Sequence, residues 1–185
     1  MIDEFLADAV RRMDKSVEAT HHEFNSVRTG RASTALLDRI NVDYYGTPTQ
    51  LKQLATINVP EPRLLTIQPF DPSSVKGIEK AIMESDLGLT PSNDGKIIRL
   101  PIPQLTEERR KELVKVVRHL AEEGRVAVRN VRRDVIHHLK ELVASGQVGA
   151  DEEHRAEDRV QKLTDEHVAA IDDLLKRKEA EIMEV

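Results

Sequence analysis

This 185-residue chain contains no cysteine and no tryptophan, and it has only three phenylalanines and two tyrosines. Without cysteine it can form no disulfide, thiolate metal site or cysteine nucleophile, which fits a reducing compartment. Since aromatic side chains are scarce, aliphatic residues and methionine must build the core, as in many helical bundles. No run is apolar enough to cross a bilayer, and the acidic start Met1–Phe5 lacks the basic residues of a signal peptide. We therefore expect a cytoplasmic protein with no membrane partner.

The formal net charge of -5 argues weakly against nucleic-acid binding, but the charge is unevenly distributed. Basic residues outnumber acidic ones from Glu107 to Asp134, whereas the stretch from Asp151 onward is acidic. The sequence therefore allows a basic surface on an acidic protein.

Three segments have apolar residues at alternating spacings of three and four, the period of one buried helical stripe. In the first segment these residues are Leu6, Val10, Met13, Val17, Thr20, Phe24 and Val27, and we expect Gly30 to end that helix. The second begins at Thr106 and runs to about Gly146, with Gly124 as its one internal weak point. Its apolar residues are Leu113, Val117, Leu120, Ala127, Val131, Val135, Leu139 and Leu142. The third begins at Asp151. Three such stripes can cover one another within one chain, which favours a monomeric bundle over a coiled-coil dimer.

The composition changes between residues 31 and 104, where most prolines and both tyrosines lie. Alternation and β-branching predict strands over Ile40–Tyr45, Arg63–Phe70 and Lys96–Leu100, and a short helix follows Asp71. We therefore predict an α+β protein in which residues 1–30 and 105–185 form an antiparallel three-helix bundle. A small β/α/β domain, residues 31–104, is inserted between its helices.

The motif Val128–Asp134 places three arginines on the second long helix, where packing gives them no evident role. A helix advances about 100° per residue, so the basic side chains share one narrow stripe opposite the apolar one. The members of this stripe are Lys111, Arg118, Arg125, Arg129 and Arg132. Arginine suits phosphate because its planar group stays charged and donates paired hydrogen bonds. The alternative is a solvated charged face that nearby Glu122 dilutes.

Other candidate sites give weaker signals. Arg28 and Arg31 flank Gly30 and could contact either phosphate or the carbonyl groups at a helix end. His154 and Glu157 can share a helix face but lack an evident third ligand, so we predict no metal. No phosphate-binding glycine loop or catalytic carboxylate pair is evident, and we predict no catalytic residue, no cofactor and no enzyme activity.

Five segments together resemble the bacterial-type ribosome recycling factor family across essentially the whole chain. They are Arg28–Ala32, Tyr44–Pro48, Ser85–Leu89, Pro103–Lys111 and Arg129–Asp134. The resemblance implies an L-shaped two-domain protein that binds the post-termination ribosome at the large subunit. It also implies that elongation factor G, with GTP bound to that partner, acts with it to separate the subunits so that they can be reused.

The resemblance also implies roles for individual residues. Ribosomal RNA contacts would be Arg132, Arg129, Arg133 and Asn130, with Arg28 and Arg31 as further contacts. The hinge would be formed by Gly30, Arg31, Gln104 and Leu105. Two other functions remain open on the residues alone: a coiled-coil scaffold that oligomerises and binds protein, and a general RNA-binding protein that does not depend on elongation factor G.

Overall fold

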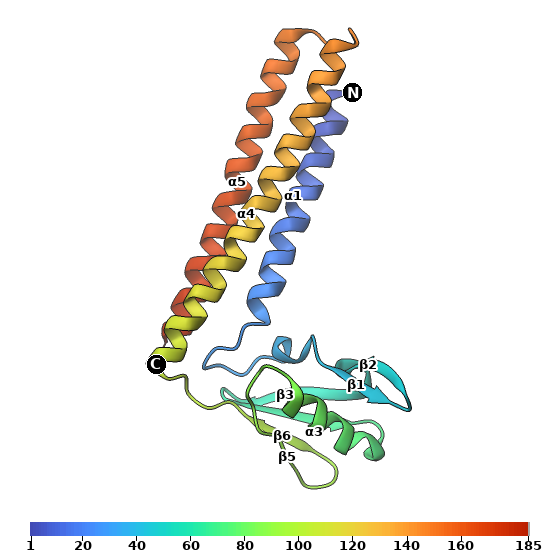
Figure 1. Cartoon of the computed structure of the whole chain (residues 1–185), viewed down its shortest axis with the longest axis vertical. Helices are drawn as coiled ribbons and strands as arrows, with labels where there is room; N and C mark the ends of the chain where they lie inside the picture. Colours follow the sequence, from blue (N-terminus) through green and yellow to red (C-terminus); the bar gives the residue numbers. More distant parts are fainter. Residues whose placement is uncertain (185) are drawn as a thin grey trace. The chain divides into compact units, whose positions relative to one another are not determined.

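The computed structural model describes residues 1–184, which divide into two compact units (Figure 1). The first unit contains Met1–Phe24 and Val114–Ala180, and the second contains Asn25–Leu113 with the C-terminal residues from Glu181. The sequence-based boundaries at residues 30/31 and 104/105 lie within the second unit and stay a prediction. Every helix in residues 1–184 is too short or too polar to span a membrane.

Three long helices form the first unit over most of their length: α1 (Ile2–Asn25), α4 (Glu107–Ala144) and α5 (Ala150–Met183). They lie side by side, with the N-terminal end of α1 near the turn that joins α4 to α5 (Figure 1). The predicted bundle of long helices is confirmed, and so is its combination with a small antiparallel sheet.

The bundle core is narrow because small residues line part of it. On α4, Ala121 and Val128 are fully buried and Gly124 is buried with them, whereas Leu120 and Ala127 are only half-buried. The prediction that Leu120 and Ala127 lie on the buried stripe of α4 was therefore wrong by one residue at each position. The buried residues of α1 include Leu6, Met13, Thr20 and Phe24, and those of α5 include Ala156, Val160, Thr164, Ile171 and Ile182.

Glycine has different roles at the two expected helix ends. The prediction that Gly30 ends the first helix was wrong, since α1 ends at Asn25 and Gly30 is not left-handed. At the end of α4, Gly146 has a φ of 75°, and its amide donates to the carbonyl of Val143 at 3.0 Å. This left-handed residue ends the helix and turns the chain toward α5.

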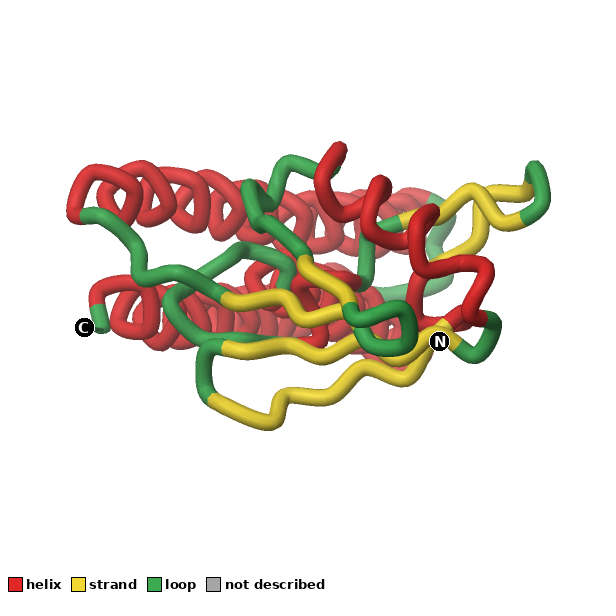
Figure 2. The backbone as a smooth tube through the Cα atoms, turned by 90° about the horizontal axis from the view of Figure 1, so that it is seen from below, coloured by secondary structure: helices red, strands yellow, loops and turns green. Residues whose placement is uncertain are grey.

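The second unit contains two sheets and the short helix α3 (Val75–Glu84). β1 (Asn41–Tyr44) and β2 (Thr47–Gln50) form an antiparallel hairpin. The other sheet has the order β3-β4-β6-β5, built from β3 (Ala55–Glu61), β4 (Leu64–Pro69), β5 (Ser92–Asn93) and β6 (Ile98–Pro101). Figure 2 shows the strands in yellow. Leu51–Leu54 forms one further turn of helix, α2, and Thr34–Leu37 and Pro72–Ser74 form 3-10 turns.

The core of this unit lies between α3 and the strands. Ile78 and Ile82 of α3 are fully buried in one cluster with Leu65, Ile67 and Ile98. The sequence identified β1, β4 and β6 but missed β2, β3 and the two-residue β5, most of whose side chains are exposed. Strands without a buried face carry little of the alternation on which sequence prediction depends.

Candidate nucleic-acid interface

The motif Val128–Asp134 lies in the middle of α4, and two valines hold it to the bundle core. Val128 is fully buried and Val131 is 6% exposed. Because residues three and four apart share a helix face, the valines face the core and the other side chains of the motif are directed away from it. Asn130 and Arg133 are exposed, and Arg129 and Arg132 are half-buried beside them. The helix therefore presents the arginines from a rigid, well-packed element.

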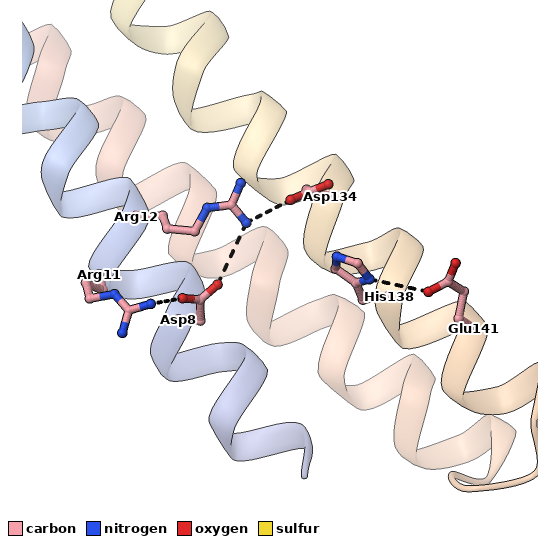
Figure 3. Close-up of polar contacts among 6 residues, drawn as sticks. All are labelled: Asp8, Arg11, Arg12, Asp134, His138 and Glu141. Carbon is pink, nitrogen blue, oxygen red and sulfur yellow. Dashed lines mark hydrogen bonds and ion pairs between the residues drawn. The ribbon is translucent and has the colours of Figure 1, made fainter.

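The last residue of the motif has a structural contact. Asp134 accepts a hydrogen bond from Nη1 of Arg12 on α1 at 2.8 Å, and Asp8 lies 3.7 Å from the same nitrogen (Figure 3). This hydrogen bond from Arg12 holds the pKa of Asp134 below its ordinary value. Asp134 thus fastens α1 to α4 next to the arginines, a role that the sequence did not indicate.

Most of the predicted basic stripe is neutralised within the bundle. Arg118 donates to Glu179 of α5 at 2.7 Å, and Arg125 donates to Asp172 of α5 at 2.6 Å. Glu122 lies 3.0 Å from Arg125 and 3.6 Å from Arg129. Lys111, the remaining member of the stripe apart from Arg132, lies 3.7 Å from Glu107. The suggestion that Glu122 dilutes the stripe is therefore confirmed for two of its arginines.

Arg132 and Arg133 differ from these residues. Within residues 1–184, neither forms an ion pair with a carboxylate; both donate to neutral amides instead. Nη1 of Arg132 lies 3.1 Å from Oε1 of Gln161, and Nη1 of Arg133 lies 3.4 Å from Oδ1 of Asn130. A neutral acceptor orients a guanidinium without cancelling its charge. The structure therefore concentrates uncompensated positive charge at one end of the row.

The pair around Gly30 belongs to the second unit and is occupied differently. Arg28 donates to the carbonyl of Pro103 at 2.9 Å, while its Nε is buried and has no hydrogen-bond partner among residues 1–184. Burial, followed by the charge of nearby Arg109, lowers the pKa of Arg28. Arg31 forms an ion pair with Glu184. Both arginines thus make contacts within the chain, but with Pro103 and Glu184 rather than with the helix-end carbonyl groups that the sequence suggested.

The four residues expected at the hinge line one cavity of about 240 Å³ in the second unit. Gly30 is half-buried, Arg31 and Gln104 are exposed, and Leu105 is only 7% exposed. On their far sides the backbone is anchored to the β3–β4 turn. Ala32 donates to the carbonyl of Pro62 at 2.7 Å, and Ile102 donates to that of Arg63 at 2.8 Å. The backbone is therefore anchored next to both segments in which the hinge is predicted.

One acidic group includes the histidine that the sequence raised as a possible ligand. Glu153 joins His154 and Glu157, so that one ligand atom from each lies within 4.8 Å of the others. The neighbouring carboxyl group of Glu157, and then burial, raise the pKa of Glu153. Lys140 lies 4.0 Å from Glu157 and competes with any cation there. The absence of a metal at this group stays a prediction.

Residues 20–183 match the family model described as ribosome recycling factor. The ribosome-recycling factor of Rubrobacter xylanophilus is 60% identical over 180 residues, covering 97% of this chain and 97% of that protein. The one from Geobacillus kaustophilus is 55% identical over 185 residues and covers 100% of both. The chain belongs to the ribosome recycling factor family.

Solved structures of ribosome recycling factors are similar to this chain over its whole length. A solution structure of one has a TM-score of 0.76 at 45% identity and covers 100% of this chain and 98% of its own. The T. thermophilus ribosome recycling factor has a TM-score of 0.68 at 48% identity and covers 100% of both chains. It is described with E. coli elongation factor G bound to the E. coli post-termination complex. The predicted family and fold class are thereby confirmed.

Proposed function

We propose that this chain binds the post-termination ribosome and, with elongation factor G and GTP bound to that partner, promotes its dissociation into subunits. Membership of the ribosome recycling factor family supports this role. The T. thermophilus relative, described with elongation factor G on a post-termination complex, supports the choice of partners. On this proposal the chain is a cytoplasmic monomer that works by binding, without a catalytic residue or a cofactor of its own.

The ribosomal RNA surface that we propose is centred on Arg132, with Arg129, Arg133 and Asn130 beside it. One observation carries this assignment. Arg132 and Arg133 face neutral amides, whereas Arg118 and Arg125 of the same helix are paired with carboxylates. An unpaired guanidinium can bind phosphate without first losing a protein partner. Phosphate would therefore be favoured at this end of the row.

Arg28 and Arg31 are proposed as further RNA contacts beside the hinge. Arg31 would exchange its ion pair with exposed Glu184 for one with phosphate. Arg28 would have to leave the carbonyl of Pro103, which would expose its buried Nε to a new acceptor. We propose that elongation factor G acts on the smaller domain, and that Gly30, Arg31, Gln104 and Leu105 absorb the resulting motion.

Cosedimentation with large ribosomal subunits over a range of salt concentrations tests the proposed surface. The intact chain is compared with an Arg129→Glu, Arg132→Glu double variant, and Arg132→Gln is compared with Arg118→Gln. Arg118 is a matched control because it is an exposed arginine of the same helix that already has a carboxylate partner. We expect saturable, salt-sensitive binding that the double variant loses and Arg118→Gln retains.

Other outcomes would support other functions. Concentration-dependent oligomerisation with no affinity for ribosomes would support the scaffold. Equal affinity for unrelated RNAs, with no effect of elongation factor G on subunit separation, would support a general RNA-binding protein. Circular dichroism of each variant separates a lost contact from a lost fold.

A further inference from the structure

The contacts between α4 and α5 follow a regular register. Arg118 of α4 pairs with Glu179 of α5, and seven residues further along α4, Arg125 pairs with Asp172, seven residues back along α5. Seven residues are close to two helical turns, so successive pairs of this kind, here called rungs, stay on the same side of an antiparallel helix pair. The next rung places Arg132 opposite Asp165.

At this third rung the direct ion pair is replaced. Arg132 donates to Oε1 of Gln161 at 3.1 Å, and Nε2 of Gln161 donates to Oδ1 of Asp165 at 2.9 Å. The amide of Gln161 thus lies between the guanidinium and the carboxylate that the register would pair. Its orientation is determined by both neighbours, because turning the amide over would place donor against donor and acceptor against acceptor.

We propose that Gln161 is a positioning residue for Arg132, which it holds in place while separating it from Asp165, so that the guanidinium stays open to phosphate. This inference rests on the proposed RNA surface. A direct pair with Asp165 would compete with phosphate for Arg132, as the carboxylate partners do at the first two rungs. Through Gln161, Arg132 uses one of its five N–H donors and keeps its charge uncompensated.

Gln161→Glu tests the proposal, because it keeps the side chain's shape and introduces a carboxylate at the atom that Arg132 contacts. In the full chain we expect affinity for large ribosomal subunits to fall about two- to fivefold at moderate salt. The salt dependence should weaken by up to about one phosphate contact. In an Arg132→Gln background the same change should have no further effect.

A second pair of variants tests the separation from Asp165. Gln161→Met removes the amide at similar length, so Asp165 can approach Arg132, and affinity should again fall. Adding Asp165→Asn to Gln161→Met should restore part of the loss, since no carboxylate then competes for the guanidinium. Circular dichroism should be the same for all these variants, because both residues are exposed on α5.

The outcomes distinguish this inference from the proposed function. If Arg132→Gln binds like the intact chain, the proposed RNA surface is wrong. If Arg132→Gln weakens binding but Gln161→Glu does not, only the role of Gln161 is overturned. An equal effect of Gln161→Glu with and without Arg132 would show general charge repulsion and would also overturn the role of Gln161. That role would likewise be overturned if Asp165→Asn failed to restore binding to the Gln161→Met variant.

Discussion

Replacing Gly124 with alanine tests whether the centre of the bundle is closely packed or merely tolerates a glycine. An added Cβ would lie 2.2 Å from Oγ1 of Thr20 on α1 and 3.1 Å from Cδ1 of Ile171 on α5. Thr20 is 5% exposed, and its hydroxyl donates to the carbonyl of Ser16 at 2.9 Å. The hydroxyl therefore cannot keep its position or its hydrogen bond if a methyl group is added.

Two effects of opposite sign determine the result. Alanine favours the helix over glycine by about 1 kcal/mol. Overpacking a core costs about 1–3 kcal/mol, and losing the hydrogen bond of Thr20 costs about 1 kcal/mol more. We therefore expect Gly124→Ala to lower the free energy of unfolding by about 1–3 kcal/mol, a fall in Tm of several degrees in a chain of this size.

Urea unfolding followed by circular dichroism at 222 nm measures the change. Ala169→Gly on the exposed face of α5 is the control, because it reports the helix preference alone and should cost about 1 kcal/mol. Adding Thr20→Ala to Gly124→Ala removes the closest atom, so the two changes together should destabilise less than their sum. A Gly124→Ala variant more stable than the parent chain would refute the close-packing argument.

Two further predictions concern titrating groups. Arg12→Met should raise the pKa of Asp134 toward its ordinary value, because the hydrogen bond from Arg12 lowers it in the folded chain. The pair's contribution to the free energy of unfolding is present above the ordinary pKa of aspartate and is lost as pH falls through the lowered pKa of Asp134. The free energies of unfolding of the parent chain and the variant should therefore converge in acid. A titration of Asp134, followed by NMR, that Arg12→Met leaves unchanged would contradict this. The hydrogen bond to Asp71 raises the pKa of Tyr44. In a Tyr45→Phe background, where absorbance reports Tyr44 alone, Asp71→Asn should lower that pKa, and no shift would argue against the bond.

Local pattern was sufficient for much of this fold. The period of three and four in Leu6, Met13, Thr20 and Phe24 predicted α1, since one helical face is buried along its whole length. The alternation in β4 predicted a strand for the same reason. Five short segments in register also indicated the family, and the match to the family model and to close relatives confirms it.

Long-range packing determined the features that local pattern missed. No local signal in α4 indicates that Gly124 faces Thr20 and Ile171, because those neighbours come from distant parts of the chain. Nor does the row of arginines reveal which members are neutralised. That depends on the register between α4 and α5, which places Glu179 and Asp172 beside two of them.

Three amphipathic helices, a small sheet, the family and a row of cations could be predicted from the sequence, because each prediction depends on residues close together along the chain. Which of the cations keep their charge uncompensated depends on how α4 packs against α5. Coulombic and hydrogen-bonding energies depend on distance in space and not on separation along the chain. Arg132 therefore differs from Arg125 because α5 presents the neutral Gln161 to Arg132 and the carboxylate of Asp172 to Arg125.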